Sequence, residues 1–380
     1  MTIGIDKLGF YSPSYIIDMR ELANARGIEP DKFTIGLGQD FMAVPPITQD
    51  TITLGANAAH TILTDEDKQS IDLVILATES GIDYSKAGAT TVHSLLGINP
   101  SARSIELKQS CYAATAGIQL AKNHIASNPG KKALVIASDI SRYGLNTAGE
   151  PTQGAGAVAI LLSENPKLIA LDDATSYHTE DIHDFYRPMY SDVAIVDGKY
   201  SNDQYQHFFE TTYTNYLSKT QRTLNDFKSL CFHIPYTKIG LKALKSITED
   251  KTLIDRYVKS THYNRMVGNI YTGSLYLNLL SLLHKVDLEA NDRIGLYSYG
   301  SGAVAEFFSG TVQEGYQDHL QVGLDEALSK RTLLSIKEYE AMYNQSLVND
   351  GSHQVLDTKK DDAHFQLSEV KHHQRFYISK

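Results

Sequence analysis

The fold is decided by two similar stretches, "GAGAVAILLS" at Gly154–Ser163 and "GSGAVAEFFS" at Gly300–Ser309. They share Gly-x-Gly-Ala-Val-Ala and a closing serine, and they begin 146 residues apart. Each follows a strand-like run, so each is predicted to form the return strand of a sheet. The repetition favours a duplicated α/β unit over its alternative, two unrelated hairpins. A duplicated unit would bury two similar sheets against shared helices.

The first half of the chain alternates strand-like and helix-like segments. "IDLVILATES" (71–80) is an apolar run ending in polar residues, as expected for a strand buried on both faces, and "KKALVIASDIS" (131–141) repeats that pattern. Between them, "CYAATAGIQLAKNHIAS" (111–127) is typical of a helix. A strand, a helix and a strand in this order predict a right-handed parallel crossover.

The second half shows the same kinds of element. "KSLCFHIPY" (228–236) indicates a strand, "TKIGLKALKSI" (237–247) a helix, and "RIGLYSYGSGAVAEFFSG" (293–310) two strands meeting at a Gly-Ser-Gly turn. The segment from Tyr177 to Thr220 is rich in Tyr, His and Asp and is predicted to be an insertion that covers a site. The tail after Lys359 is expected to add an edge strand or hairpin.

Composition restricts the class of protein. At 380 residues without a linker-like tract, two tightly apposed domains are expected, divided at 1–165 and 166–380. A net charge of −10 argues against nucleic-acid and membrane surfaces as partners, because phosphate-rich partners require a basic face. With no apolar run long enough for a membrane span, no signal-like N-terminus and two cysteines in all, we expect a cytoplasmic protein with free thiols.

Cys111 stands at the head of the predicted helix 111–127. A cysteine at a helix N-terminus faces unpaired backbone N–H groups and the positive end of the helix dipole, which favour the thiolate. The small residues that follow it would let the helix approach its neighbours closely and leave the thiol at the bottom of a narrow channel. A core cysteine acting as a small hydrophobe is the alternative, and position alone does not decide between them.

Two further side chains stand at the ends of predicted strands. His233 ends "LCFH" before Pro235, at the strand edge where ligand sites of α/β sheets lie, and Glu79 closes "LVILATE". A solvated strand terminus is the alternative reading of Glu79. Cys231 lies within the apolar run and is assigned to the core.

Several stretches together carry a resemblance to a known family. They are "ATES", "ELKQSCYAATAG", "DFYRP", "IVDGKYS", "HIPYTKIGLKAL", "GNIYTGSLYLNLL" and "YSYGSGAVAEFFSG", which run in order between about Gly27 and Gly310. They resemble the 3-hydroxy-3-methylglutaryl-CoA synthase family in its short bacterial form, within the thiolase superfamily. The resemblance implies a five-layer αβαβα fold built from a duplicated α/β unit, which also accounts for the internal repeat.

The resemblance implies an acyltransferase reaction and a catalytic set. Acetyl-CoA would condense with acetoacetyl-CoA and water to give 3-hydroxy-3-methylglutaryl-CoA and CoA, a step of the mevalonate pathway of isoprenoid biosynthesis. Cys111 matches the acylated nucleophile, Glu79 the general acid/base and His233 the catalytic histidine. A thiolate conserves the activation of a thioester, and the weakly acidic acetyl methyl needs a carboxylate in a poorly hydrated pocket.

Further residues are carried over in the same way. A homodimer is implied, and the enolate oxygen is expected to meet the Cys111 N–H and a donor from the Gly300–Gly302 turn. The expected substrate-binding positions are Glu29 and Pro30 at the adenine end, Tyr143, Thr152 and Ser201 in the channel, Asn269 at the acetoacetyl thioester, Ser301 in the turn, and Lys238 and Lys242 at the pantetheine and phosphates; Asp139 and Asp184 support the site. Lys238 and Lys242 are four apart and share a helix face, which is otherwise typical of a solvated face.

The sequence departs from the family at two positions and leaves rival functions to separate. Ser110 stands where Ala is expected and Ala113 where some members have Gly, which affects the fit around the acetyl group.

The rival functions are a β-ketoacyl carrier-protein synthase III-like enzyme, a carrier-protein-dependent synthase of polyketide β-branching, and a silent acyl-CoA-binding scaffold. Glu79 argues against the first because decarboxylation needs no base, the two lysines against the second, and the intact Cys, Glu and His set against the third.

No metal and no organic cofactor beyond the CoA substrates are expected. His178 and His183 lie five apart among acids in "HTEDIHD", a spacing that separates them on a helix, so a covering loop is favoured over zinc. "GAGAV" lacks the GxGxxG spacing of a dinucleotide site, and the sequence has no Walker A motif.

Overall fold

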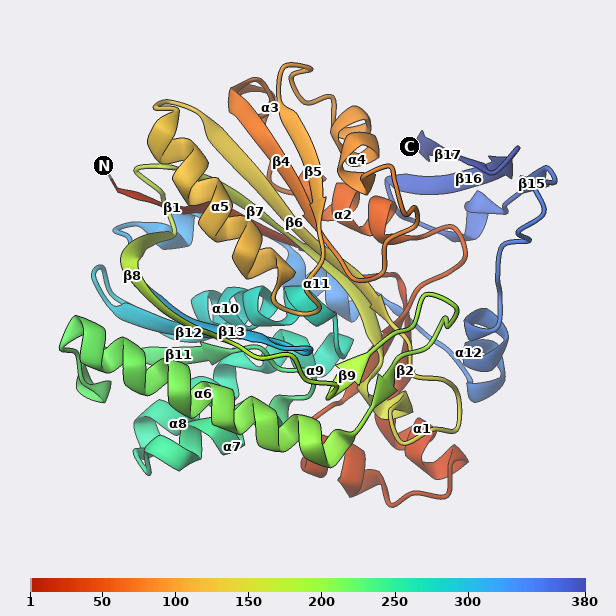
Figure 1. The fold of residues 1–380 in the computed structure, drawn as a ribbon. Helices are drawn as coiled ribbons and strands as arrows, with labels where there is room; N and C mark the ends of the chain where they lie inside the picture. The colour runs from red at the N-terminus through yellow and green to blue at the C-terminus, as the bar shows by residue number, and fades with distance from the viewer. Residues whose placement is uncertain (1) are drawn as a thin grey trace.

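A nine-stranded mixed sheet runs through the computed structural model, which describes residues 2–380 (Figure 1). In spatial order its strands are β11 (Ser229–Phe232), β12 (Arg293–Gly300), β13 (Val304–Val312), β8 (Ile169–Thr179), β1 (Ile3–Tyr11), β7 (Gly154–Glu164), β6 (Lys132–Ser141), β4 (Ile71–Ala77) and β5 (Arg103–Leu107). Because β4 and β6 pair in parallel with α5 (Ala113–Ser127) between them in the chain, the parallel pairing of the predicted crossover is confirmed.

The sheet contains the same arrangement twice. Parallel β4 and β6 lie beside antiparallel β7, and parallel β11 and β12 lie beside antiparallel β13. The two repeated stretches are β7 and the β12–β13 turn with β13, so the predicted duplication is confirmed in the topology. The halves are hydrogen-bonded through β1 and β8, where Gly4 faces Ala170, so the two expected sheets form one continuous sheet. The expected division at residue 165 falls in the turn between β7 and β8.

Helices cover the sheet in three layers. Each helix layer packs on the sheet through its own apolar cluster. The first cluster packs α2 (Thr51–His60) and α4 (Gly88–Leu96) on the first half of the sheet, and the second encloses α5 and α10 (Ser274–Lys285). The third packs α6 (Gly198–Thr220), α7 (Thr237–Ile247) and α8 (Lys251–Ser260) on the second half. Figure 1 shows α10 between the two halves of the sheet. The five-layer αβαβα fold is therefore confirmed.

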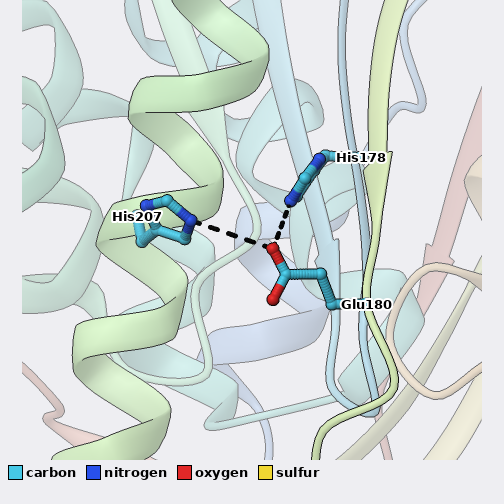
Figure 2. Close-up of side chains that lie close together, drawn as sticks. All are labelled: His178, Glu180 and His207. Atoms are coloured by element: carbon cyan, nitrogen blue, oxygen red, sulfur yellow. Dashed lines mark hydrogen bonds and ion pairs between the residues drawn. The ribbon is translucent and has the colours of Figure 1, made fainter.

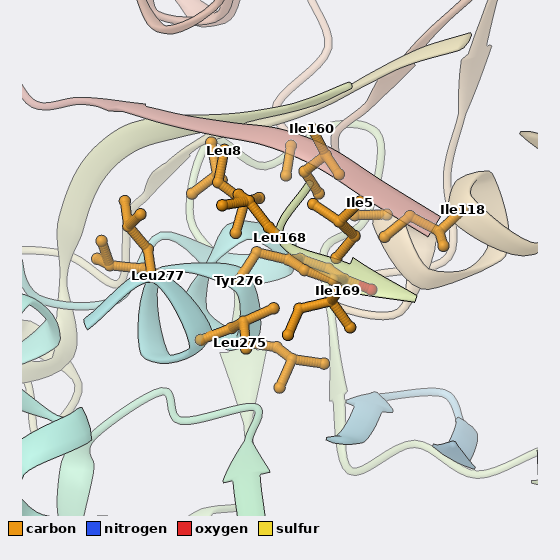
Figure 3. Close-up of a cluster of buried hydrophobic side chains, with 14 of the residues drawn as sticks. Ile5, Leu8, Ile118, Ile160, Leu168, Ile169, Leu275, Tyr276 and Leu277 are labelled. Carbon is orange, nitrogen blue, oxygen red and sulfur yellow. The ribbon is translucent and has the colours of Figure 1, made fainter. Parts of the chain in front are cut away.

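The central core is formed by both halves of the chain. Figure 3 shows Ile5 and Leu8 of β1, Ile118 of α5 and Leu275 of α10 in one cluster, and each is essentially inaccessible to solvent. Burial of each such side chain contributes about 1.5–3 kcal/mol. Gly117 shows why α5 needs small residues: an added Cβ would come within 3.1 Å of Val135 and 3.3 Å of Ile75.

The prediction that residues 177–220 form an insertion covering the site was wrong for residues 198–220. Residues 198–220 form α6, whose Tyr205, Phe208 and Phe209 are buried against the sheet, so this segment is a structural layer. The aromatic residues recur at helical spacing, but the polar residues between them obscured the stripe. The part that forms a loop is 180–197, with the short strands β9 (Phe185–Tyr186) and β10 (Ile195–Val196).

Smaller elements complete the molecule. β2 (Tyr15–Asp18), β3 (Phe41–Val44) and β14 (Thr332–Leu333) form one small sheet, and β15 (Gln354–Val355), β16 (Phe365–Lys371) and β17 (Gln374–Ser379) form another, which confirms the predicted hairpin in the tail. The remaining helices are α1 (Met19–Ala25), α3 (Asp65–Ser70), α9 (His262–Val267), α11 (Leu324–Ser329) and α12 (Ile336–Tyr343), with single turns at η1 (Lys32–Leu37), η2 (Glu150–Thr152), η3 (Leu224–Asp226), η4 (Tyr271–Gly273), η5 (Tyr316–His319) and η6 (Thr358–Lys360). Within residues 2–380 none of the helices has the length and apolar character that a membrane crossing requires.

Candidate active site

The loop before α5 holds Cys111 against the end of β12. A Cβ on Gly300 would lie 2.5 Å from the Tyr112 nitrogen and 2.7 Å from the Gln109 oxygen, so only glycine lets the two backbones pack this closely. Ser110, directly before the thiol, has a φ of 44°, a left-handed conformation that is strained for a residue with a Cβ. The repeated glycine thus fixes the position of the cysteine loop.

The same repeat glycine in the first half contacts the corresponding loop of the second half. A Cβ on Gly154 would lie 2.8 Å from the backbone nitrogen and oxygen of Asn269. Asn269 precedes η4 and α10, as Cys111 precedes α5. Each half therefore supplies a glycine that positions a functional loop of the other half, which gives the sequence repeat a physical reason.

Glu79 lies beside the thiol. The Cys111 Sγ and Glu79 Oε1 are 3.5 Å apart, and both side chains are partly buried. Asp139 of β6 holds the Glu79 backbone: its Oδ1 accepts hydrogen bonds from the Glu79 N–H at 2.9 Å and from the hydroxyls of Thr78 and Ser80, each at 2.9 Å. Three of the residues expected in the site are therefore brought together at the ends of β4, β6 and the loop before α5.

Burial dominates the electrostatics of this group. It raises the pKa of Glu79 above its usual range, and the negative charge of Asp139 raises it further. Burial, followed by the charges of Glu79 and Asp139, raises the pKa of Cys111 as well. The guanidinium of Arg187, which donates a hydrogen bond to the Glu79 carbonyl, opposes the rise for Glu79. Both shifts favour the protonated form of the side chain.

The sequence places Cys111 at the head of the helix, where the N–H groups and the helix dipole favour the thiolate, but the structure begins the helix later. Cys111 lies two residues before α5, and the first N–H groups of the helix have other acceptors. The Ala113 N–H donates to the Ser110 carbonyl at 3.3 Å, and the Ala114 N–H donates to Thr272 Oγ1 at 2.7 Å. With these donors occupied, burial and then the charges of two nearby carboxylates raise the pKa of Cys111 despite the helix dipole.

An aromatic wall faces the thiol. Cys111 and Tyr143 pack against a small cluster that contains Phe185 and Tyr271. The ring centroids of Tyr143 and Phe185 are 6.0 Å apart, and Asn269 Nδ2 donates to the Tyr143 hydroxyl at 3.4 Å. Phe185 comes from the loop 180–197, so part of the predicted covering segment closes this side of the site.

Asp184 fixes the turn between β12 and β13. It is fully buried, and it accepts hydrogen bonds from the Gly302 N–H at 2.9 Å, the Tyr299 hydroxyl at 2.7 Å and the Ser201 hydroxyl at 3.2 Å. The predicted supporting acid therefore holds both Ser201 and the turn that carries Ser301.

His233 is buried at the end of β11. Burial lowers the pKa of His233 to about 3, so the imidazole is neutral, and its Nδ1 has no hydrogen-bond partner within residues 2–380. Phe232, the preceding residue, faces Tyr297 of β12, whose strand ends against the cysteine loop. Among the described residues, His233 forms no hydrogen bond with Cys111 or Glu79.

Comparison with known proteins identifies the family. Residues 1–167 match the family profile described as "Hydroxymethylglutaryl-coenzyme A synthase N terminal", and residues 169–255 and 242–378 match the profile of its C-terminal part. The chain belongs to the hydroxymethylglutaryl-CoA synthase family. It is 51% identical over 385 residues to the hydroxymethylglutaryl-CoA synthase of Enterococcus faecalis, covering 99% of this chain and 100% of the relative.

Solved structures of the hydroxymethylglutaryl-CoA synthase family share the fold. A crystal structure of an HMG-CoA synthase complexed with CoA is 45% identical, with 100% of both chains covered and a TM-score of 0.97. A structure of MvaS in complex with 3-hydroxy-3-methylglutaryl coenzyme A is 35% identical, covers 100% of this chain and 99% of that one, and has a TM-score of 0.89.

A cavity of about 670 Å³ leads to Glu79. Its lining includes Glu79, Ser110, Ser301 and Arg187, and a second cavity of about 690 Å³ shares Arg187 with it. Of the residues expected to bind substrate, Ser301 lines a cavity, and the others line neither of the two: Glu29, Pro30, Tyr143, Thr152, Ser201, Lys238, Lys242 and Asn269. Their roles stay predictions.

Pro30, Lys238 and Lys242, which are expected to bind CoA, nevertheless lie close to the contact between η1 and α7. Pro30 precedes η1, and its carbonyl accepts a hydrogen bond from Thr34 Oγ1 at 3.2 Å. The end of η1 contacts the start of α7, where Thr237 Oγ1 donates to the Gly38 carbonyl at 2.8 Å. Lys238 and Lys242 follow on α7, the first half-buried and the second exposed.

Sequence reasoning missed three contributors to the site. Arg187 was within the quoted "DFYRP" and Thr272 within "GNIYTGSLYLNLL", but neither was given a role. Thr272 accepts the hydrogen bond from the Ala114 N–H, and Tyr271 supplies an aromatic wall with a φ of 45°. The motif positions were the available signal, but only the tertiary contacts show what these side chains do.

Proposed function

We propose that this protein condenses acetyl-CoA with acetoacetyl-CoA and water, giving 3-hydroxy-3-methylglutaryl-CoA and CoA through an acetyl-cysteine. The observation that carries the proposal is the half-buried Cys111 with its Sγ 3.5 Å from Glu79 Oε1, in a chain of the hydroxymethylglutaryl-CoA synthase family. A nucleophile and an acid/base of raised pKa in contact are what acyl transfer followed by carbon–carbon bond formation requires.

Acylation comes first. As Cys111 attacks the acetyl thioester, its proton passes toward Glu79, whose raised pKa makes it a good acceptor. Glu79 returns this proton to the CoA sulfur as the sulfur–carbon bond breaks, so that CoA leaves as the thiol and Glu79 is a carboxylate again. The oxyanion that forms accepts hydrogen bonds from the Cys111 N–H and from the Ser301 position of the turn, because the Gly302 N–H already donates to Asp184.

Condensation follows on the same side of the site. Glu79 takes a proton from the acetyl methyl, and the enolate carbon attacks the ketone carbon of acetoacetyl-CoA. Neutral His233 stabilises the developing alkoxide as a hydrogen-bond donor, and Asn269 holds the acetoacetyl thioester. The proton on Glu79 passes to the alkoxide, and water then cleaves the enzyme thioester: its hydroxyl joins the acyl carbon of the product and its proton restores the Cys111 thiol.

The test is an assay of CoA release combined with mass spectrometry of the protein. Acetyl-CoA alone should give one equivalent of free CoA and a mass increase of one acetyl group, and added acetoacetyl-CoA should give continuous turnover. Turnover with malonyl carrier protein in place of acetoacetyl-CoA would instead support the carrier-protein synthase. Binding of acyl-CoA without an adduct would support the scaffold.

The two lysines of α7 are proposed to hold the phosphates and pantetheine of CoA. They are i, i+4 neighbours on one helix face. Lys238→Ala and Lys242→Ala should each raise the KM for CoA thioesters about five-fold with little change in kcat, because an exposed ion contact is worth about 1 kcal/mol. Initial-rate kinetics with both substrates measure the effect.

Two other lysines provide a matched control. Lys86 and Lys108 line the cavity that leads to Glu79. If CoA entered through that cavity, Lys86→Ala and Lys108→Ala would raise the KM and the α7 variants would leave it unchanged. That result would return Lys238 and Lys242 to a solvated helix face.

A homodimer is proposed from the edge of the sheet. β5 is the outermost strand beside β4, its residues are half-buried or exposed, and Ile105 is 39% exposed. An edge strand with partly exposed residues and unpaired backbone groups pairs readily with a second copy across a two-fold axis. Sedimentation should give twice the 42.1 kDa chain mass, and Ile105→Lys should shift it toward the monomer; an unchanged dimer in this variant would place the interface elsewhere.

The cellular setting is proposed from the two cysteines and from the reaction. Both cysteines are free thiols, which suits a reducing compartment such as the cytoplasm. The product of the proposed reaction would enter the mevalonate pathway of isoprenoid biosynthesis.

A further inference from the structure

Three potential metal ligands converge outside the site already described. Figure 2 shows His178 and Glu180, from the end of β8 and the residue after it, pointing toward His207 of α6. The Nε2 of His178 is 2.6 Å and the Nε2 of His207 is 3.9 Å from Glu180 Oε1. One ligand atom from each residue can be chosen so that all three lie within 4.8 Å of one another.

These distances are close to those of a metal site. Zinc binds imidazole nitrogen at about 2.0–2.1 Å and carboxylate oxygen at about 2.0–2.2 Å, so tetrahedral ligand atoms lie about 3.3 Å apart. The 2.6 Å pair must open and the 3.9 Å pair must close, each by less than about 1 Å. All three side chains are at least 30% exposed, so small rotations are available and a water molecule can occupy the fourth position.

The backbone that carries the ligands is held in place. His178 faces Ala305 in the β8–β13 ladder, and the backbone N–H and C=O of Glu180 bond to Ala303 at 3.1 and 2.7 Å. The His178 ring packs against Phe208, with centroids 4.8 Å apart, which fixes the register of α6 beside β8. Because strand residues two apart share a face, His178 and Glu180 point the same way toward His207.

We propose that His178, Glu180 and His207 bind a divalent cation of the late first transition row, with Zn²⁺ as the best match. Two imidazole nitrogens and one carboxylate with a free fourth position are donors that these ions favour, whereas Ca²⁺ and Mg²⁺ require mostly oxygen ligands. The expectation that this segment holds no metal considered His178 with His183. The structure brings in His207 instead, 29 residues after His178.

A bound ion would join the outer helix layer to the segment beside the site. The Ala303 that pairs with Glu180 follows the turn of Ser301 and Gly302, and Ile182 N–H donates to the Gly302 carbonyl at 3.1 Å. Metal binding should therefore stabilise the folded protein by linking α6 to β8, and the midpoint of thermal unfolding should rise by several degrees in excess Zn²⁺.

Co²⁺ titration of the full-length protein tests the proposal. One equivalent should give the intense visible absorption of tetrahedral Co²⁺, and Zn²⁺ should displace it. His207→Ala and Glu180→Gln should each weaken binding at least ten-fold. Cys111→Ala should leave the absorption unchanged, which excludes the thiol as the ligand.

His353 offers a matched control. It is another exposed histidine paired with a carboxylate, since its Nε2 is 2.7 Å from Glu369 Oε2. His353→Ala should bind Co²⁺ as the unmodified protein does. Loss of the signal in His353→Ala with retention in His207→Ala, or the absence of stoichiometric binding in the unmodified protein, would overturn the proposal; circular dichroism verifies that each variant is folded.

Discussion

Cys111→Ala should abolish formation of the acetyl-enzyme and leave the protein folded. The sulfur is the atom to which the acetyl group is transferred, and no other group beside Glu79 can replace it. Alanine is tolerated because α5 continues with Ala113 and Ala114, and loss of one sulfur atom beside the aromatic wall should cost about 1 kcal/mol of unfolding free energy. Intact-protein mass spectrometry after incubation with acetyl-CoA measures the adduct.

Cys231→Ala is the control for this result. Cys231 is fully buried in β11, and burial raises its pKa, so it has no access to substrate. Its replacement should leave the extent of acetylation unchanged, apart from a modest loss of stability. If Cys111→Ala formed a stable acetyl adduct and Cys231→Ala did not, Cys231 would be the nucleophile and Cys111 the core cysteine.

Glu79→Gln separates acylation from condensation. The amide keeps the shape and hydrogen bonding of the carboxylate but cannot remove a proton from the acetyl methyl. The rate of product formation should fall by roughly two to four orders of magnitude, the usual size of a lost general base. Spectrophotometric loss of acetoacetyl-CoA measures condensation, and mass spectrometry measures the acetyl-enzyme on the same sample.

Acylation should survive in this variant for an electrostatic reason. The charge of Glu79 is one of the causes that raise the pKa of Cys111. Removing it lowers the thiol pKa toward its usual value, which increases the thiolate fraction and offsets the missing proton acceptor. CoA release with accumulation of acetyl-enzyme is therefore expected.

Glu106→Gln serves as the matched control. Glu106 also lines the cavity, and burial raises its pKa, but its Oε2 accepts a hydrogen bond from the Gly88 N–H at 2.7 Å. Its amide variant should condense within about three-fold of the unmodified rate. If Glu79→Gln condensed at a similar rate, Glu79 would be only a solvated strand terminus. A carrier-protein synthase supplied with a malonyl donor would then be favoured.

Much of the fold could be predicted from local patterns. The apolar runs 71–80 and 131–141 contain β4 and β6, and the helix 237–247 was predicted with the bounds of α7. The repeat around Gly154 and Gly300 predicted the duplication. These succeeded because strand periodicity, buried runs and turn residues are determined within a few positions of the chain.

What could not be predicted depends on contacts between distant segments. The pKa of Cys111 is raised by burial first and then by the charges of Glu79 and Asp139, which lie 32 residues before it and 28 after it. The proposed metal site could not be predicted for the same reason, because His178 lies on β8 and His207 on α6. Sequence resemblance could name the residues of the site, but distances, charges and cavity walls are properties of the assembled chain.

The duplication is incomplete at one edge of the sheet, since β5 has no counterpart beside β11. The four residues of β11 are all buried, so within residues 2–380 the nine-stranded sheet offers β5 as its one open edge. A chain with two such edges could add copies at both ends without limit, as fibrils do. A chain with a single open edge can pair once, and its partner then has none left to offer. In the proposed homodimer, the strand absent from the second half would act as a stop on self-assembly, limiting growth along the sheet to two chains.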